Sequence, residues 1–384
     1  MKFEGTIKSK FPTMGTTIFT VMTALAKEFN AINLSQGFPE FDPHPKLLEA
    51  FENAIRSGNN QYAPMAGWMP LREALAEKIN DFYQLDINPE TEITITAGGT
   101  QAIFTAITSL LKEGDEVVVF GPAYDCYVPS IELVGAKPVF YNLEAPDFAI
   151  DWSKVAKLIS QKTKMIILNT PHNPTGRVLK QEDFKKLEKL VHGSDIIILS
   201  DEVYEHIVYD KQKHLSILQQ EGLVGRSIAV FSFGKTYNTT GWKVGYVVAP
   251  EALTTEFRKV HQYTVFSVST PAQIAYTEIL KEKEIYLELS DFYEQKRDFF
   301  RNAIGASKLE LLPCEGTYFQ LATYDKISDQ NDVDFAKWLT REKGVAAIPI
   351  SVFYNKKVET KAIRFCFAKE EKTLNKAAEW LSKV

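Results

Sequence analysis

Short hydrophobic runs, rich in valine and isoleucine, recur along the middle of the chain. They occupy residues 92–97, 116–120, 137–141, 164–169, 195–200, 227–231 and 244–248. Most are apolar at successive positions and not only at alternate ones, which is typical of strands that are buried on both faces. The pattern therefore predicts the strands of a mostly parallel sheet covered by helices.

Amphipathic helical patterns lie between these runs. Pro70 opens one of them, as prolines often do in a first helical turn, and Leu75 and Ile79 continue its apolar stripe. Residues 181–191 form another, with Phe184 and Leu187 on one side. Strands that alternate with helices indicate βαβ units. We therefore predict an α/β fold whose large domain contains a doubly wound, mostly parallel sheet.

The pattern changes after about residue 275. Charged amphipathic helices are expected at 275–283 and 287–302, isolated strands at 318–322 and 362–367, and a last helix from Lys372. We interpret this region as a smaller α+β domain that the N-terminal arm completes. The predicted boundaries are 1–44 for the arm, 45–275 for the large domain and 276–384 for the small domain.

Composition and charge exclude several classes of protein. The net charge of −5, with acidic and basic residues interspersed, argues against a nucleic-acid surface. No stretch approaches the roughly 20 apolar residues of a membrane span. The apolar run at 18–26 resembles an export signal only weakly, because it leads directly into a motif at 33–38. The cysteines Cys126, Cys314 and Cys366 are widely spaced, as expected of free thiols, so we predict a cytoplasmic protein.

Lys235 is the first candidate for chemistry. It follows the apolar run 227–231, at the expected carboxyl end of a strand, where open α/β sheets bind ligands. Ser232 precedes it and a second cation, Lys243, follows. A lysine in this setting suits a Schiff base beside a phosphate. The alternative is an ordinary surface lysine after a strand.

A glycine pair, Gly98-Gly99, follows the first predicted strand and precedes a helix predicted at 102–111. Glycines let the backbone approach a ligand closely, and the start of a helix offers free N–H groups to an anion. The sequence matches neither the P-loop nor the dinucleotide-binding motif, so nucleotide functions lose support. A tight turn without a ligand is the alternative.

Two polar motifs follow other buried strands. Residues 169–176 form a proline-rich loop that can hold the Asn173 amide rigidly, so that it donates to a phenolate oxygen; an ordinary connection is the alternative. Asp201 ends another strand, where a buried carboxylate needs a cationic partner such as a pyridinium nitrogen, unless it is a helix N-cap. Tyr204 can reach the hydroxyl of the same ring. Glu205 and His206 lack the spacing of metal ligands, so we predict no metal.

Together these motifs resemble the class I and II aminotransferases of fold type I. The resemblance covers nearly the whole chain in order. It implies a homodimer with shared active sites, the cofactor pyridoxal 5'-phosphate (PLP), and substrates that are amino acids and 2-oxo acids. It also implies that Lys235 binds the cofactor covalently and moves protons, that Asp201 pairs with the ring nitrogen, and that Asn173 and Tyr204 bind the ring oxygen.

The resemblance assigns the remaining site residues as well. Tyr124 would stack on the ring, and Tyr62 would reach the partner's phosphate. Arg364 and Gly37 would bind the substrate carboxylate. The phosphate would be held by Gly99, Thr100, Gln101, Ser232 and Lys243. Many relatives have arginine where this chain has Lys243, which keeps the charge but loses the bidentate fork.

Within the family, the chain is most similar to bacterial methionine aminotransferases and to the kynurenine and glutamine transaminases. No arginine is evidently placed for a side-chain carboxylate, which favours neutral apolar, aromatic or thioether substrates. An aromatic mouth would be formed by Phe19, Phe38, Tyr124 and Phe266. Two alternatives stay open. The first is a cysteine-S-conjugate or cystathionine β-lyase with the same cofactor. The second is a non-enzymatic regulator, which would need a DNA-binding extension, and the residues before Asn33 are too few and not basic enough for one.

Overall fold

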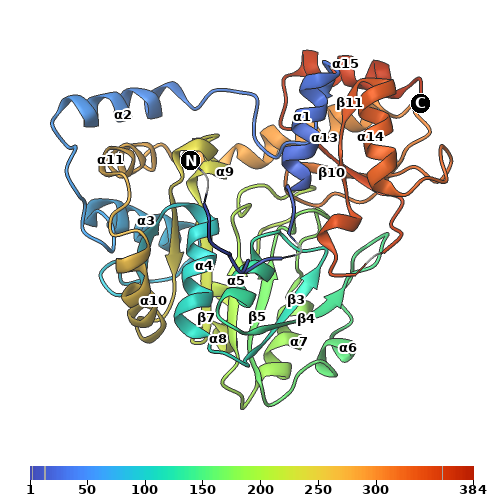
Figure 1. Ribbon diagram of the computed structural model, residues 1–384. Helices are drawn as coiled ribbons and strands as arrows, with labels where there is room; N and C mark the ends of the chain where they lie inside the picture. The colour runs from blue at the N-terminus through green and yellow to red at the C-terminus, as the bar shows by residue number, and fades with distance from the viewer. Residues whose placement is uncertain (2, 13, 357) are drawn as a thin grey trace.

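A seven-stranded sheet runs through the larger part of the molecule (Figure 1). The computed structural model describes residues 1, 3–12, 14–356 and 358–384. In spatial order the strands are β2 (Ile93–Thr96), β8 (Gly245–Val248), β7 (Ser227–Ser232), β6 (Ile197–Asp201), β5 (Thr163–Asn169), β3 (Glu116–Gly121) and β4 (Lys137–Asn142). Only β8 runs antiparallel to its neighbours among these strands, and the other pairs are parallel. The predicted α/β fold with a mostly parallel sheet is confirmed.

Helices cover both faces of this sheet. Successive strand residues point to opposite faces, so Val117 and Val119 of β3 belong to one core and Val118 and Phe120 to the other. The first core includes residues of α4 (Gly98–Leu110), α5 (Tyr127–Leu133) and α10 (Glu251–Thr264). The second includes residues of α3 (Met69–Tyr83), α6 (Trp152–Ala156), α7 (Gln181–Val191) and α8 (Glu221–Val224). Burial on both faces explains the unbroken apolar runs.

The C-terminal residues build a second, smaller group of layers, at the upper right of Figure 1. Its antiparallel sheet has the order β12 (Ile348–Pro349), β13 (Ala362–Cys366), β10 (Phe319–Thr323) and β9 (Glu310–Leu311). The helices beside it are α13 (Leu289–Ala303), α14 (Asp332–Lys343) and α15 (Glu371–Leu381). From the N-terminal part, β1 (Ile32–Asn33) pairs with β11 (Val345–Ala346), and α1 (Ile18–Glu28) contacts α14. We therefore propose domain boundaries at 1–44, 45–275 and 276–384.

Two predicted helix boundaries are wrong. α4 begins at Gly98 and not at residue 102, because Gly98 adopts a φ of +79°, which lets the chain turn from β2 directly into the helix. The helix predicted at 275–283 is α11 (Thr270–Ile279), which starts earlier because Pro271 occupies its first turn. A separate α12 (Lys283–Leu287) follows it, and α11 packs against α2 (Pro45–Arg56).

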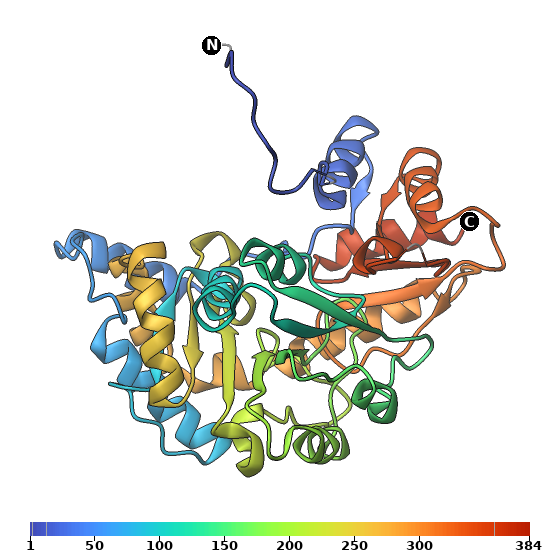
Figure 2. The same ribbon diagram turned by 60° about the horizontal axis from the view of Figure 1, so that its bottom comes forward.

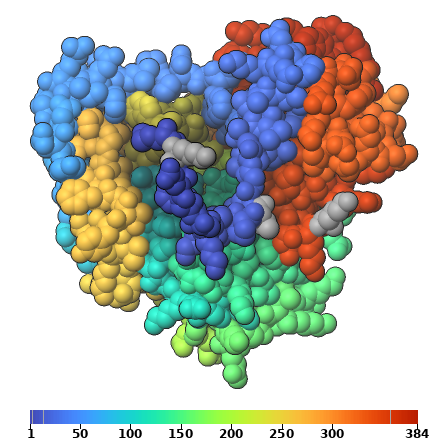
Figure 3. Space-filling view, in the orientation of Figure 1, coloured from blue at the N-terminus to red at the C-terminus, as the bar shows by residue number. Residues whose placement is uncertain are grey.

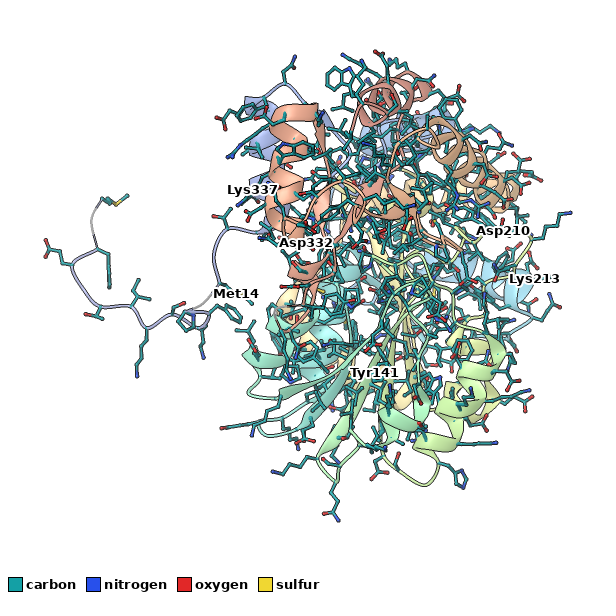
Figure 4. All side chains as sticks on the ribbon, turned by 90° about the vertical axis from the view of Figure 1, so that its right-hand side faces the viewer. Met14, Tyr141, Asp210, Lys213, Asp332 and Lys337 are labelled. Carbon is teal, nitrogen blue, oxygen red and sulfur yellow. The ribbon has the colours of Figure 1, made fainter. Side chains whose placement is uncertain are left out.

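The described residues among the first fourteen extend away from the rest of the chain in Figures 2 and 4, and Met14 is labelled there in Figure 4. Their apolar side chains Phe3, Ile7 and Met14 are exposed. Among the described residues, no helix is both long and apolar enough to cross a membrane.

Candidate functional site

A cavity of about 290 Å³ lies at the carboxyl ends of the central strands. Strands β5, β6 and β7 each end at it, and α1 and the small sheet close it from the other side. In Figure 3 the face between α1 and α2 is hollowed, and the N-terminal residues cross in front of the hollow. The cavity is lined by Phe19, Gln36, Gly37, Phe38, Gly99, Thr100, Ile103, Tyr124, Asp125, Asn169, Asn173, Asp201, Val203, Tyr204, Ser232, Lys235, Thr240, Lys243, Phe319 and Arg364.

Lys235 projects into this cavity from α9 (Phe233–Thr236), the short helix that follows β7. Its Nζ donates to Tyr318 Oη at 2.9 Å and to the Gly37 carbonyl at 3.3 Å. The pKa of Lys235 is lowered to about 8, mainly because burial disfavours the charged amine. The side chain therefore has a substantial neutral fraction near physiological pH, as a nucleophile or base requires.

Asp201 ends β6 and is buried, with 3% of its surface exposed. It accepts a 2.6 Å hydrogen bond from Tyr127 Oη, and no cationic side chain of the described residues forms a salt bridge with it. Burial raises its pKa to about 6. A turn and not a helix follows, so the N-cap alternative is wrong. The arrangement suits a ligand that brings a cation to this carboxylate.

The start of α4 forms a cradle for an anion. No side chain caps this helix end, so its first N–H groups are free for a ligand. Lys243 adopts a left-handed φ of +54°, and a Cβ added to Gly98 would lie 3.3 Å from its Nζ. Glycine at position 98 therefore allows the ammonium group to approach the helix start. Thr100 is held by a 3.1 Å hydrogen bond between its hydroxyl and Tyr124 Oη.

Arg364 enters the opposite wall of the cavity from β13, with 1% of its surface exposed. It donates to Asn173 Oδ1 at 2.8 Å and to the Ser35 carbonyl at 3.3 Å, and its guanidinium lies 3.9 Å from the centre of the Phe319 ring. Within the described part of the chain, Arg364 Nε is buried without a hydrogen-bond partner. A buried guanidinium with unused donor capacity suits a carboxylate ligand.

Three predicted site residues do not line the cavity. The Gln101 side chain bonds to Ala97 N at 2.9 Å, to Thr105 and to His261, and the role of Gln101 in holding a phosphate stays a prediction. Tyr62 and Phe266 form an exposed edge-to-face pair, with ring centres 5.0 Å apart. The other predicted residues all line the cavity.

Sequence reasoning missed several residues that contact the site. Tyr127 donates to Asp201, Tyr318 accepts from Lys235, and Phe319 stacks on Arg364. Tyr127 lies three residues after the predicted ring-stacking residue Tyr124, and this spacing is the only local signal that could have pointed to it. The two β10 residues gave no signal, because they reach the cavity only when the small sheet packs against the large one.

Together, the polar groups of the cavity suit one kind of ligand. A helix start with Lys243 accepts an anion, the Lys235 amine reacts with a carbonyl, and Asp201 needs a cation. Arg364 is left for a second, separate carboxylate. The arrangement can therefore bind a phosphorylated, cationic carbonyl compound next to a carboxylic acid.

Comparisons with known proteins agree with this interpretation. The sequence profile of the family described as aminotransferase class I and II matches residues 30–381. The chain is 52% identical to a methionine aminotransferase of Escherichia coli, over 98% of each chain. It is 33% identical to human kynurenine–oxoglutarate transaminase 1, over 94% of this chain and 93% of that protein.

A solved structure is also similar over the full length. A crystal structure of YbdL from Escherichia coli, described as identifying a methionine aminotransferase function, has a TM-score of 0.97 at 51% identity and covers 99% of this chain and 100% of that one. The names of these relatives give no support to the lyase alternative. The fold, the cavity and the comparisons lead to one conclusion: this chain belongs to the class I and II aminotransferases.

Proposed function

We propose that this aminotransferase uses PLP to move an amino group between a neutral L-amino acid, preferably methionine, and a 2-oxo acid. The observation that carries the proposal is one cavity in which a lysine amine, a buried carboxylate and a buried arginine converge at the carboxyl end of a mostly parallel sheet. When bound, PLP supplies an electron-withdrawing ring that stabilises negative charge at the substrate's α carbon.

The residues of the chain divide the work of holding this cofactor. Lys235 would bind it covalently, and Asp201 would keep its ring nitrogen protonated. Asn173 and Tyr204 would bind the ring oxygen, and Tyr124 would stack on the ring. The phosphate would lie among the free N–H groups of α4 and the side chains of Thr100, Ser232 and Lys243. The lowered pKa of Lys235 and the raised pKa of Asp201 support this assignment.

Substrate selection would follow from the opposite wall. Arg364 would bind the α-carboxylate, with the Gly37 backbone beside it. Among the described lining residues, Arg364 is the only guanidinium, and Phe19, Phe38 and Phe319 add aromatic surface. This environment favours neutral side chains. A thioether gains about 0.3–1.5 kcal/mol from each aromatic contact, which ranks neutral substrates weakly, so the preference for methionine rests mainly on the named relatives.

A homodimer in the cytoplasm completes the proposal. Tyr62 and Phe266 are exposed in one subunit, with 78% and 52% of their surfaces accessible, and do not reach their own cavity. Such a solvent-facing aromatic pair suits an interface in which Tyr62 contacts the partner's phosphate and Phe266 the partner's substrate. The three free cysteines suit a reducing compartment.

A half-reaction screen tests the proposed function. Purified protein loaded with PLP is offered twenty amino acids one at a time, while the cofactor's absorbance is followed. We expect methionine and aromatic amino acids to convert the cofactor fastest, and aspartate slowest. Cystathionine is the discriminating substrate, because release of pyruvate without any added 2-oxo acid would show a β-lyase instead.

Mixing two inactive variants tests the shared site. Lys235→Ala subunits and Tyr62→Phe subunits should regain activity when they exchange, because a hybrid dimer has one site free of both changes. Activity no higher than the sum of the two parents, with subunit exchange verified, would contradict the dimer proposal.

A further inference from the structure

The hydroxyl of Tyr318 touches the reactive atom of the site. It lies 2.9 Å from Lys235 Nζ and 2.8 Å from the carbonyl oxygen of Gly37, which itself lies 3.3 Å from the same Nζ. Lys235 Nζ, Tyr318 Oη and the Gly37 carbonyl oxygen thus form a closed triangle of hydrogen bonds. A side chain at position 37 would meet the Phe319 ring at 2.8 Å, so glycine there lets the carbonyl come this close.

The Tyr318 ring is held firmly. It is fully buried, and it packs against Tyr204, Tyr293 and Phe319 at ring-centre distances of 5.3, 5.5 and 4.9 Å. A hydroxyl on a ring fixed in this way has a defined position relative to Lys235. Burial raises the pKa of Tyr318 well above its ordinary value, so the hydroxyl keeps its proton.

The direction of each hydrogen bond follows from the number of protons. A phenol has one proton to donate, and Tyr318 gives it to the Gly37 carbonyl, which cannot donate in return. Tyr318 is therefore an acceptor toward Lys235. A neutral lysine amine has two N–H bonds and one lone pair. Tyr318 and Gly37 take the two N–H bonds, so the lone pair is left to face away from both of them, toward the cavity.

We propose that Tyr318 is a positioning residue that, together with the Gly37 carbonyl, fixes both N–H bonds of Lys235 so that its lone pair points at the substrate's α carbon. This inference rests on the proposed function, in which Lys235 moves a proton. When the C–H bond breaks, the lone pair of Nζ would take the proton and form the new N–H bond, and bound PLP would accept the electron pair. Nζ would later give up the same proton, so that the amine is neutral again.

The charges around Lys235 predict how Tyr318 affects its titration. Arg364 and Lys243 are the nearby cations, Asp201 is the nearby carboxylate, and the Cys366 thiol lies on β13. Tyr318 and Gly37 accept hydrogen bonds from Nζ, and an acceptor stabilises an ammonium more than an amine. Loss of the Tyr318 hydroxyl should therefore lower the pKa of Lys235 further below 8.

The test compares Tyr318→Phe with Tyr293→Phe. Tyr293 is an equally buried tyrosine that packs on the Tyr318 ring, but its hydroxyl bonds to Asn238 at 3.1 Å and not to Lys235. The first readout uses the full-length protein freed of cofactor, and measures how its rate of covalent PLP uptake rises with pH. The second compares ordinary with α-deuterated methionine in the loaded enzyme.

For Tyr318→Phe we expect the midpoint of PLP uptake to move to lower pH by about one unit, the size of one charge-assisted hydrogen bond. We expect kcat to fall about tenfold to a hundredfold, less than the about 10²–10⁴-fold of a whole general base because Lys235 remains, with an increased deuterium isotope effect and little change in KM. Tyr293→Phe should keep the wild-type midpoint and isotope effect.

If both variants behave alike in these two readouts, the proposed role of Tyr318 is wrong. If Tyr318→Phe does not fold, a crystal structure of the wild-type protein without cofactor at pH 9 decides the question. Nζ within hydrogen-bond distance of Tyr318 and Gly37 supports the inference, and Nζ turned away from Tyr318 overturns it. Failure of the wild-type protein to take up PLP at Lys235 would refute the proposed function instead.

Discussion

The short segment 201–205 has buried carboxylates on two sides, and the two sides differ in the partners of these groups. Asp201 and Tyr204 face the cavity, whereas Glu202 and Glu205, on the same turn, face the interior behind it. All four residues are buried. They share the same backbone and nearly the same depth, so their differences come from their partners.

On the rear side, behind the cavity, both carboxylates have several hydrogen-bond partners. Glu205 accepts from Lys78 at 2.6 Å, from Tyr83 at 2.6 Å and from Tyr246 at 3.1 Å. Burial alone would raise the pKa of Glu205, but the Lys78 ammonium and His206 hold it well below its ordinary value. Glu202 likewise accepts from His214, Ser200 and the backbone of Ile217.

On the cavity side, Asp201 and Arg364 form no salt bridge within the described residues. Asp201 has a neutral donor, Tyr127, and a raised pKa, and Arg364 keeps a free Nε within the described residues. The contrast shows that burial does not by itself mark a functional charge. A buried charge with a complete set of partners stabilises the fold, and one that lacks them is held for a ligand at a cost in stability.

The largest expected effect is on catalysis at the cavity. Lys235→Ala should slow transamination at least about a thousandfold, because both covalent attachment and proton transfer are lost. The melting temperature should change little, since no salt bridge of the described residues involves Lys235. Steady-state assays with methionine measure the loss, and near-normal turnover would refute the role of Lys235.

The rear side should respond in stability instead. Lys78→Met leaves Glu205 buried without its cation, which should cost about 3–5 kcal/mol of unfolding free energy in denaturant titrations. Specific activity of the folded fraction should persist. The control is Lys46→Met, which breaks an exposed pair with Glu282 of similar length, 2.7 Å, and should cost at most about 1 kcal/mol. Equal losses for both variants would contradict the distinction.

Asp201→Asn should stabilise the protein when the cofactor is removed. The folded pKa of about 6 lies above the ordinary 3.8, so the stability that depends on this group is present below pH 3.8 and is lost as the pH rises through about 6. That shift corresponds to about 3 kcal/mol. Cofactor-free Asp201→Asn should therefore melt higher than cofactor-free wild type at pH 7.5. The order should reverse after PLP is added, and the absence of any crossover would count against the assignment.

The smallest effect concerns the substrate carboxylate. Arg364→Lys keeps the charge but loses the fork, so kcat/KM should fall about a hundredfold, or roughly 2–3 kcal/mol, for all amino and 2-oxo acids alike. The control is Phe19→Leu, which should reorder preference among methionine, phenylalanine and leucine without a uniform loss. If Arg364→Lys only reorders preferences, the carboxylate assignment is wrong.

The sequence predicted the cavity side better than the rear side. Lys235, Asp201 and Asn173 each follow a buried strand, and the ends of parallel strands meet at one edge, so their convergence follows from local pattern. The Lys78–Glu205 pair joins residues 127 positions apart and has no local signal. Tyr318 was equally hidden, because it comes to Lys235 from the small sheet.

Other contacts of the predicted site residues also depend on packing. The Gln101 side chain turns toward His261 on α10, a contact that depends on how two helices pack. Tyr62 and Phe266 lie outside the cavity of their own subunit, so a single chain cannot complete their predicted contacts. The sequence pattern therefore predicts which residues meet at the ends of parallel strands. It does not predict contacts that form only when helices, sheets or subunits pack together.

The most direct test of the central claim is chemical labelling of the wild-type protein. PLP-loaded protein is reduced with borohydride, digested and mapped by mass spectrometry. The account predicts a yellow protein that loses its colour on reduction, with one pyridoxyl adduct per chain, on Lys235 and not on Lys243 or Lys78. An adduct distributed over several lysines, or none on Lys235, would contradict it.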